Sequence, residues 1–500
     1  MDTAWFYTLL PLSLLLLALI FPSNVRNRKL PPSPVPALPV IGHLHLLRPP
    51  MHRIYHKFSQ KSGPIFSLRF GTRLVVVVSS SAAAEECFTK NDIVLANRPR
   101  LSIGKYIGYN YTGLTNASYG EHWRNLRRIT TIEIFSSSRL NMFQAIRQDE
   151  IKLLLRKLYQ KSQNDFARVE LKSLLSELSF NIIMRIVAGK RYFGESEDNG
   201  HAKKYRELIK EAFTYGGVSN PADFFPVLKW IDYNGKEKGL QRLSKKMDAF
   251  LQGLIDEHRR DDIKTTMIGH FLDLQESQAE YYTDLIIKGI IMVMLLAGTD
   301  TSSVTIEWAM SALLNHPQKL EKAQAELDST VGSNRLMDES EVPKLAYLQN
   351  IISETFRLFP AAPLLLPHEA SEDCKIGGYN ITKGTILLVN AWAIHRDPMT
   401  WDDPASFNPE RFESEKTIGP AKLLPFGMGR RSCPGSGLAQ RVVGLALGSL
   451  IQCFEWRRMS EEMVDLSEGI GISMPKAIPL EAECKARRVL HKVFSSGMVV

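Results

Sequence analysis

Residues 426–435 read FGMGRRSCPG, and this stretch decides how the rest of the chain is interpreted. Its cysteine, Cys433, is preceded by Phe426 and Arg431 and is followed by Gly435. Glycine lets backbone N–H groups come close to the sulfur, and an aromatic ring can shield the sulfur from water. The guanidinium of Arg431 is suited to a carboxylate. A cysteine in this setting is expected to be a ligand-binding thiolate.

The pattern F-x-x-G-x-R-x-C-x-G resembles the haem-binding loop of the cytochrome P450 family at every fixed position of that loop. In that family a cysteine thiolate is the proximal ligand of the haem iron. The resemblance implies that Cys433 binds the iron of haem b, and that Phe426, Arg431 and Gly435 contact the cofactor. The other interpretation of Cys433 is that it is merely a buried cysteine.

A second motif, residues 297–302, reads AGTDTS and lies in a long apolar segment with helical spacing. Its small residues, Ala297 and Gly298, are expected to leave room above a flat cofactor for dioxygen and substrate. The motif is similar to the oxygen-activation motif of the same family. This similarity makes Thr301 and Asp300 the catalytic residues, a hydroxyl and a carboxylate that relay protons for the reduction of dioxygen. The other interpretation is a helix in which the threonine bonds back to a carbonyl.

Three charged residues form a third signature. Glu354 and Arg357 are spaced to share one helical face, and Arg411 follows in the sequence P-E-R-F. Alone, the first two would be an ordinary surface ion pair. The resemblance instead assigns Glu354, Arg357 and Arg411 to a buried network with a structural role.

Three further residues are expected to contact the haem propionates. Trp123 and Arg127, in W-x-x-x-R, resemble the family's residues that meet a propionate. His368 stands where many family members carry a propionate-binding arginine, which leaves the protonation and geometry of that contact open. The motifs follow one another in the family's order over essentially the whole chain.

The spacing of apolar residues predicts a mostly helical chain with a minor β region and no repeats. A hairpin is expected at 65–70 and 74–78, with a late strand at 385–389. The resemblance implies one large haem-thiolate domain over residues 46–500 with the cytochrome P450 fold. Helices are predicted at 148–158, 172–188, 203–212, 240–258 and 283–314.

The N-terminus is predicted to anchor the chain in a membrane. Residues 4–21 carry no charge and are about long enough to cross a bilayer, so a transmembrane anchor is placed at 1–22. The basic residues Arg26, Arg28 and Lys29 follow this segment, which places the remainder in the cytosol as a single-pass protein of the endoplasmic reticulum membrane. A cleaved signal peptide is disfavoured, because no basic stretch precedes the segment.

A basic and proline-rich hinge at 23–45 separates the anchor from the catalytic domain. The hinge has too many prolines to form a helix, and it is too short to form a domain. It is therefore expected to be a stiff spacer that orients the domain on the lipid. An ordinary linker without an orienting role is the other interpretation.

Composition limits the partners. Lys and Arg outnumber Asp and Glu by 62 to 53, which suits anionic lipid or an acidic protein partner. The basic residues are scattered and no nucleic-acid signature is present, so nucleic acid is not expected.

The five cysteines lack C-x-x-C spacing, which argues against a disulfide scaffold or a zinc site. The resemblance implies electrons from NADPH through NADPH–cytochrome P450 reductase, O2 as co-substrate, and docking that involves Arg124, Arg127 and Arg128.

The regions that line the substrate pocket in this family are apolar here, with several tyrosines. Such a lining suits a hydrophobic ring compound with few charges. The chain resembles the plant clade of isoflavone hydroxylases and lignan-modifying enzymes, which implies hydroxylation of a phenolic ring compound. A terpenoid substrate, a haem-thiolate isomerase or dehydratase, and a non-catalytic haem protein are the alternatives. The predicted pocket residues are Tyr109, Tyr111, Ala297, Ala362, Leu366 and Ser473.

Overall fold

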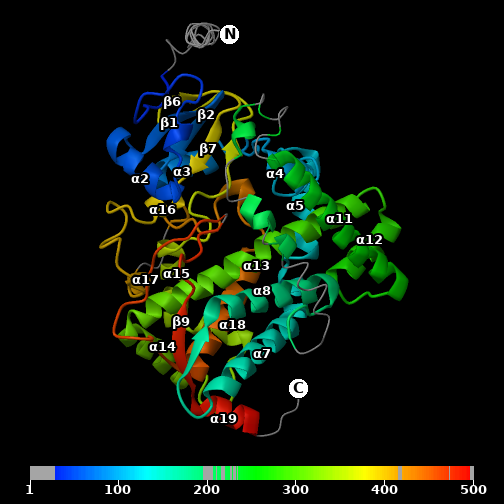
Figure 1. The fold of residues 1–500 in the computed structure, drawn as a ribbon, viewed down its shortest axis with the longest axis vertical. Helices are drawn as coiled ribbons and strands as arrows, with labels where there is room; N and C mark the ends of the chain where they lie inside the picture. The colour runs from blue at the N-terminus through cyan, green and yellow to red at the C-terminus, as the bar shows by residue number, and fades with distance from the viewer. Residues whose placement is uncertain are drawn as a thin grey trace, which may run out of the picture.

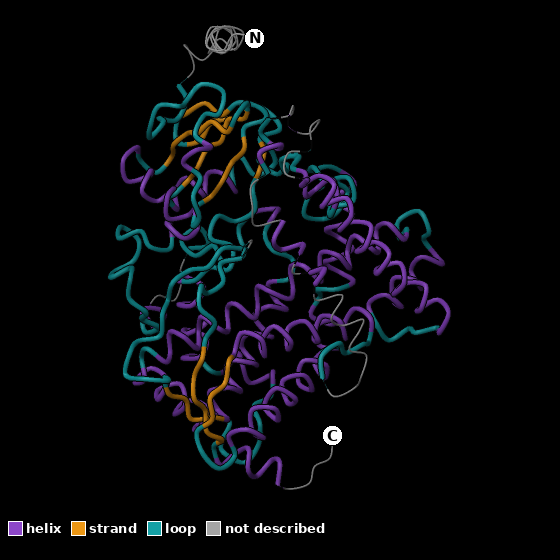
Figure 2. Tube along the Cα trace, in the orientation of Figure 1, coloured by secondary structure: helices purple, strands orange, loops and turns teal. Residues whose placement is uncertain are grey.

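The computed structural model describes residues 29–194, 207–209, 211–215, 220–225, 228, 232, 235–414, 419–471 and 473–495. These residues form a small sheet region beside a larger body of helices (Figure 1, Figure 2). The prediction of a mostly helical chain with a minor β region is confirmed.

The largest sheet has the strand order β1–β2–β7–β4, with β1 (Ile65–Phe70), β2 (Arg73–Val78), β7 (Ile386–Val389) and β4 (His368–Glu369). β1 and β2 form the predicted hairpin, and Gly71 in its turn has φ +55°. Val76 and Val78 pack on one face of the sheet, whereas Val75 and Val77 pack on the other. Because both faces are buried, the strand is a continuous valine run without polar alternation.

Two smaller sheets have the orders β3–β9–β8 and β5–β6. Their strands are β3 (Ala167–Glu170), β9 (Glu481–Ala486), β8 (Phe454–Arg457), β5 (Cys374–Ile376) and β6 (Tyr379–Ile381). The remaining short elements are η1 (Leu44–Leu46), α2 (Met51–Ser62), α3 (Ser81–Phe88), α4 (Ser102–Tyr106), η2 (Pro221–Asp223), η4 (Glu339–Lys344), α16 (Ala391–Ile394), α17 (Arg411–Ser414), η5 (Gly429–Arg431) and α19 (Arg488–Ser495).

The helical body is built around α13 (Asp284–Leu314), which crosses the middle of the molecule in Figure 1. The hydroxyl of Thr283 caps this helix by accepting from the N–H of Ile286, and Asp284 lies favourably in its first turn. α13 packs against α8, α18, α15 and α11. The surrounding helices are α5 (Glu121–Glu133), α6 (Ser137–Met142), α7 (Gln144–Ser162), α8 (Leu171–Ala188), α11 (Lys236–Asp261), α12 (Met267–Ser277), α14 (Pro317–Thr330), α15 (Ala346–Leu358) and α18 (Ser436–Cys453).

The predicted helices at 148–158, 172–188, 240–258 and 283–314 correspond to α7, α8, α11 and α13. The helix predicted at 203–212 lies partly outside the described residues. Within the described part of the chain, α13 alone is long and apolar enough to cross a membrane. Its packing among neighbouring helices makes it a core helix.

The predicted anchor at 1–22 lies outside the described residues, and the hinge is described from Lys29 onwards. The proline-rich stretch follows the edge of the sheet, because the N–H of Ser67 donates to the carbonyl of Pro32 over 2.8 Å. The hydroxyl of Ser67 donates to the carbonyl of Pro31 over 2.8 Å as well. This part of the hinge therefore packs on β1.

Candidate active site

The cysteine loop lies between η5 and α18 and is closed by its own backbone. The N–H of Cys433 donates to the carbonyl of Phe426 over 2.8 Å. Gly429 has φ +72°, a conformation that L side chains rarely adopt, and a Cβ there would collide with the Asp92 carboxylate. A Cβ at Gly435 would lie 3.9 Å from the Cys433 sulfur. Gly429 is therefore required by the shape of the loop, whereas a Cβ at Gly435 would make only an ordinary contact with the sulfur.

Cys433 retains exposed surface, yet protein atoms surround its thiol closely enough to desolvate it. Burial raises the pKa of the Cys433 thiol above its ordinary value, while the backbone N–H of Gly435 and the Arg127 cation act in the opposite direction. The thiol therefore keeps its proton at neutral pH when it binds nothing. Binding of a metal ion would require the thiolate, which the Gly435 N–H and the Arg127 cation would stabilise.

Three arginines, Arg98, Arg127 and Arg431, donate to backbone carbonyls around this loop. Arg127 donates to the carbonyl of Ser432 over 2.6 Å, and Arg98 donates to the carbonyl of Pro367 over 2.7 Å. Arg431 donates to three carbonyls in the same way. Among the described residues, none of these guanidinium groups has a carboxylate partner.

The electrostatics of these arginines indicate an anionic ligand. Burial, and then the nearby Arg431, lower the pKa of Arg98 to about 9. Burial and Arg127 lower the pKa of Arg431 to about 10. The buried Nε of Arg98 has no hydrogen-bond partner in the described part of the chain. Because guanidinium groups bind carboxylates strongly, the residues present fit the two propionates of a haem.

Arg98 was missed by the sequence analysis. It lies in a stretch that reads Arg98-Pro99-Arg100, where no linear pattern separates a buried arginine from an exposed one. In the structure Arg98 is buried and Arg100 is exposed. The difference arises from tertiary packing alone.

Trp123 and Arg431 contact each other. The guanidinium of Arg431 lies 4.3 Å from the centroid of the Trp123 ring, a cation–π contact. The indole N–H of Trp123 donates to the carbonyl of Leu114 over 3.1 Å. Trp123 therefore supports Arg431, and its own contact with a propionate stays a prediction.

His368 is buried and neutral. Its Nδ1 lies 2.7 Å from the carbonyl of Leu95, which can only accept, so Nδ1 carries the proton. Burial, followed by Arg98 and Arg431, lowers the pKa of His368 well below its ordinary value. His368 therefore supplies no cation at the position where the family often has an arginine. Its Nε2 can accept a hydrogen bond, and contact with the cofactor stays a prediction.

One face of α13 is accessible at its centre. Ala297 is exposed and Thr301 is half-buried, although most of the helix is buried. The Thr301 hydroxyl donates to the carbonyl of Ala297 over 2.8 Å, so its oxygen remains able to accept. The expectation for Gly298 was wrong, because a Cβ there would lie 2.7 Å from Ile183 on α8. Gly298 allows close packing of α13 on α8, and Ala297 alone leaves room on the accessible face.

Asp300, next to Thr301, is paired with Ser473. The hydroxyl of Ser473 donates to Oδ2 of Asp300. Burial raises the pKa of Asp300, and the hydrogen bond from Ser473 and the cation of Lys172 partly oppose this rise. A carboxyl group with a raised pKa exchanges protons more readily near neutral pH, as proton relay requires.

Two segments with predicted pocket residues, the loop with Ala362 and Leu366 and the segment with Ser473, are joined by a hydrogen bond. The loop that contains Ala362 and Leu366 is tied to Arg98 through the Leu366 carbonyl, at 2.9 Å. The Met474 N–H, beside Ser473, donates to the carbonyl of Ala361 over 2.9 Å, which joins this loop to the Ser473 segment.

The two tyrosines contact other groups. The Tyr109 hydroxyl donates to Asp248 on α11 over 2.9 Å, and its ring lies beside Gly289 on α13. The Tyr111 ring lies under Arg100, 5.5 Å from the guanidinium carbon. The pocket assignment of both tyrosines stays a prediction.

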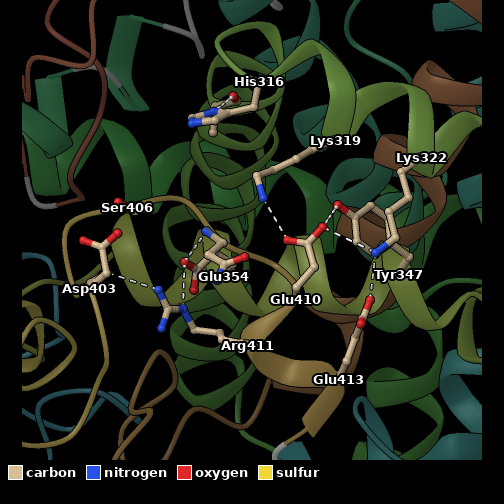
Figure 3. Close-up of polar contacts among 12 residues, drawn as sticks. His316, Lys319, Lys322, Tyr347, Glu354, Asp403, Ser406, Glu410, Arg411 and Glu413 are labelled. Atoms are coloured by element: carbon tan, nitrogen blue, oxygen red, sulfur yellow. Dashed lines mark hydrogen bonds and ion pairs between the residues drawn. The ribbon is translucent and has the colours of Figure 1, made fainter.

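The structure brings Glu354, Arg357 and Arg411 into one buried network. Arg357 donates to both carboxylate oxygens of Glu354, over 2.7 and 2.8 Å, and both side chains are fully buried. Arg411 donates to Glu354 over 3.1 Å (Figure 3). The remaining N–H groups of Arg357 donate to three backbone carbonyls.

This network extends to α14 through Glu410, which the sequence analysis did not single out. Glu410 accepts from Lys319 and from Tyr347, each over 2.8 Å (Figure 3). Although burial opposes it, these hydrogen bonds lower the pKa of Glu410 to about 2.

His395 links the same network to the cysteine loop. The N–H of Leu424, two residues before Phe426, donates to Nε2 of His395 over 2.7 Å. Nδ1 must then carry the proton, and it lies 3.2 Å from the carbonyl of Arg357. Burial, with the cations of Arg396 and Arg357, lowers the pKa of His395 to about 3, so this link is neutral.

A cysteine in a glycine-rich loop, beside arginines that have no carboxylate partner among the described residues, is typical of haem-thiolate proteins as a class. The chain belongs to the cytochrome P450 family, because the family model described as "Cytochrome P450" matches residues 31–478. The protein is therefore a haem-dependent monooxygenase that receives electrons from NADPH through a redox partner reductase.

Its relatives include "Cytochrome P450 81Q32" of Catharanthus roseus, 64% identical over 98% of each chain. The "(+)-piperitol/(+)-sesamin synthase CYP81Q2" of Sesamum radiatum is 59% identical over 93% of this chain and 92% of its own length. An "Isoflavone 3'-hydroxylase" of Medicago truncatula is 54% identical over 98% of this chain and 99% of its own. Among solved structures, a zebra fish cytochrome P450 with progesterone matches with TM-score 0.75 and 28% identity over 88% of this chain and all of the other.

The chemistry of the site divides between cofactor and protein. Haem, when bound, supplies the activation of dioxygen. Cys433 would hold it, and Arg98, Arg127 and Arg431 would neutralise its carboxylates. On α13 the chain places the carboxyl of Asp300 beside the hydroxyl-bearing Thr301, and their role in moving protons stays a prediction.

Proposed function

We propose that this chain is a membrane-bound plant monooxygenase that oxidises a phenolic ring compound of the flavonoid, isoflavone or lignan type. Ring hydroxylation is the first choice, and oxidative ring closure between neighbouring oxygens is a related outcome. The observation that carries the proposal is the high identity, over nearly the full length, to relatives whose names specify isoflavone hydroxylation and sesamin formation.

Accessible apolar residues on α13 and in the loop that contains Ala362 support an apolar substrate. Ala297 and Leu366 are exposed, and Ala362 is half-buried. The carboxylate of Asp300, next to Thr301 on α13, accepts a hydrogen bond from Ser473. A surface of this kind favours a hydrophobic ring with few charges, whose phenolic oxygens are oriented by a small number of polar contacts.

The proposal includes a single-pass anchor at 1–22 in the endoplasmic reticulum membrane, with the catalytic domain in the cytosol. NADPH–cytochrome P450 reductase is the proposed electron donor. Arg124 and Arg128 are exposed on α5 and suit an acidic docking surface, whereas Arg127 donates inward to Ser432. Docking by the two exposed arginines should weaken as ionic strength rises.

The test is expression of the full chain in microsomes with a plant reductase, followed by incubation with flavonoids, isoflavones, lignans and diterpenoids. We expect NADPH-dependent products from the phenolic compounds, heavier by one oxygen or lighter by two hydrogens. The Cys433→Ser variant is the matched control without activity. Products from diterpenoids alone would overturn the substrate class, and conversion without NADPH would indicate an isomerase or dehydratase.

A further inference from the structure

A hairpin near the C-terminus brings Ser473 to the catalytic helix. The N–H of Gly469 donates to the carbonyl of Pro475 over 2.7 Å, and the N–H of Ala477 donates to the carbonyl of Ser467 over 2.8 Å. These bonds pair residues 467–469 with residues 475–477 as the two arms of a hairpin, and Ser473 lies just before the second arm. The hydroxyl of Ser473 donates to Asp300 of α13. A segment far away in the sequence thus contacts the residue beside Thr301.

The tip of this hairpin is held firmly. The residue after Ser473, Met474, uses both of its backbone groups, since its N–H donates to the carbonyl of Ala361 and its carbonyl accepts from the indole of Trp308 over 2.8 Å. Ser473 itself is only 8% exposed. Its hydroxyl is therefore fixed in place toward the carboxylate.

We propose that Ser473 is a positioning residue for proton delivery, because its hydroxyl fixes one carboxylate oxygen of Asp300 and leaves the other to exchange protons with Thr301 and solvent. Ser473 acts on Oδ2, and Oδ1 accepts no hydrogen bond from the described residues. The proposal rests on the monooxygenase activity and is independent of the substrate class.

Proton delivery decides whether the electrons from NADPH end in product or in hydrogen peroxide. Insertion of one oxygen atom into a C–H bond consumes O2, two electrons from NADPH through the reductase, and two protons, and it releases one water. Asp300 passes protons inward and regains them from solvent, so its own state is unchanged after each cycle. When delivery fails, the same two electrons and two protons leave with O2 as hydrogen peroxide. The ratio of product to peroxide therefore reports on proton delivery.

Few charged groups bear on Asp300. Lys172 of α8 is the cation that acts on it, and the same lysine acts on Glu307, farther along α13. Glu307 accepts from the N–H of Leu480 over 2.9 Å and faces the Lys476 cation of the hairpin. Removing the Ser473 hydroxyl leaves these groups in place and takes away a hydrogen bond that stabilises the charged carboxylate.

The experiment compares Ser473→Ala, Ser473→Thr and Asp300→Asn, and combines the first with the last, in the full-length haem protein with reductase and a substrate it converts. We expect Ser473→Ala to lower the product formed per NADPH roughly tenfold, as for the loss of one hydrogen bond to a charged group. Peroxide rises accordingly. Loss of this hydrogen bond raises the pKa of Asp300, so the part of the pH–rate profile that Asp300 governs moves to higher pH, whether Asp300 acts as the acid or as the base. Ser473→Thr restores most of the coupling, because it keeps the hydroxyl.

A double-mutant cycle gives a second readout that does not depend on turnover. The thermal stabilities of the single and double variants should be non-additive, because Ser473→Ala costs little once Asp300 has lost its charge. Ser467→Ala, an exposed serine of the same hairpin that bonds Asp465 and not Asp300, is the matched control, and its coupling and pH profile should match those of the parent protein.

The inference is overturned if Ser473→Ala leaves the product-to-peroxide ratio and the pH limb unchanged. It is also overturned if Ser473→Ala has the same effect with and without Asp300→Asn, since Ser473 would then act on the substrate only. Failure of the proposed substrate class is distinct, because the parent protein would then yield no phenolic product at all.

Discussion

Two arginine clusters lie in the interior of this protein, and they differ in what their guanidinium groups bind. In the network of α15, every N–H of Arg357 has an acceptor, and the carboxylate of Glu354 balances its charge. Near Cys433, Arg98 and Arg431 donate to carbonyls only, and one nitrogen of Arg98 has no partner among the described residues. The first cluster is complete within the chain, whereas the second has donors and charge to spare that suit the carboxylates of a haem.

Removal of one partner from the complete network should have the largest effect. Arg357→Ala removes the bidentate partner of the buried Glu354 and leaves Arg411 to balance its charge, which should cost about 3 kcal/mol or more of unfolding free energy. The expected result is little or no folded, haem-containing protein, measured as soluble yield and urea unfolding. Arg100→Ala, at an exposed arginine, is the control. A well-folded Arg357→Ala protein would show that the paired cluster is not structural.

Adding a cation beside Arg98 and Arg431 should also lower the free energy of unfolding. His368→Arg introduces the residue that is common in the family, but here it would lie beside Arg98 and Arg431 in a buried site. We expect a loss of about 2 kcal/mol or more in stability, from the burial of a charge without a partner. His368→Gln, which stays neutral and can accept a hydrogen bond, should be tolerated. A more stable His368→Arg protein would mean that Arg98 does not already supply the cation.

Arg98 itself should matter for the cofactor more than for the fold. Arg98→Met removes a buried charge that no carboxylate in the described chain balances, and with it the hydrogen bonds to the carbonyls of Leu366 and Pro367. These effects oppose each other, so the stability of the protein without haem should change little. Haem should be lost roughly tenfold faster, since one charge-assisted contact with a propionate is gone. The measurement is transfer of haem to apomyoglobin, with Arg100→Ala as control. Equal rates for all three proteins would contradict the assignment of Arg98.

The smallest effect is expected at the edge of the complete network. Glu410→Gln should cost about 1 kcal/mol or less at pH 7, because Glu410 is partly exposed and solvent screens its charge. The folded pKa of Glu410 is about 2, below the ordinary value of 4.5. The stability difference should thus be constant above about pH 4.5 and shrink as the pH falls toward 2. Urea unfolding between pH 7 and 4 checks the plateau, and a difference that shrinks already at pH 6 would contradict it.

The contrast between the clusters also distinguishes residues that the sequence predicts from residues whose role depends on tertiary packing. Cys433, Glu354, Arg357 and Arg411 lie in linear motifs, because each depends on spacing within a loop or a helix. The structure brings the last three into one network as predicted, and the bond of Cys433 to iron stays a prediction. Arg98 has no such pattern, since its role depends on burial between distant segments.

Other details depend on packing that spacing does not encode. The contact of Gly298 with Ile183 required knowledge of how α13 and α8 cross. The partner of Ser473 depended on where the C-terminal hairpin folds back, so a predicted pocket residue was found bonded to Asp300. The valine run of β2 predicted a strand, but only the fold shows that both of its faces are buried.

The central claim is that the sulfur of Cys433 binds the haem iron. The most direct test is the absorption spectrum of the reduced, carbon monoxide-treated protein, compared with those of Cys433→His and of Cys453→Ser, a buried cysteine of α18. The account predicts the Soret band diagnostic of thiolate ligation in the parent protein and in Cys453→Ser, and its loss in Cys433→His. A thiolate band that persists in Cys433→His, or that is absent from the parent protein, would contradict it.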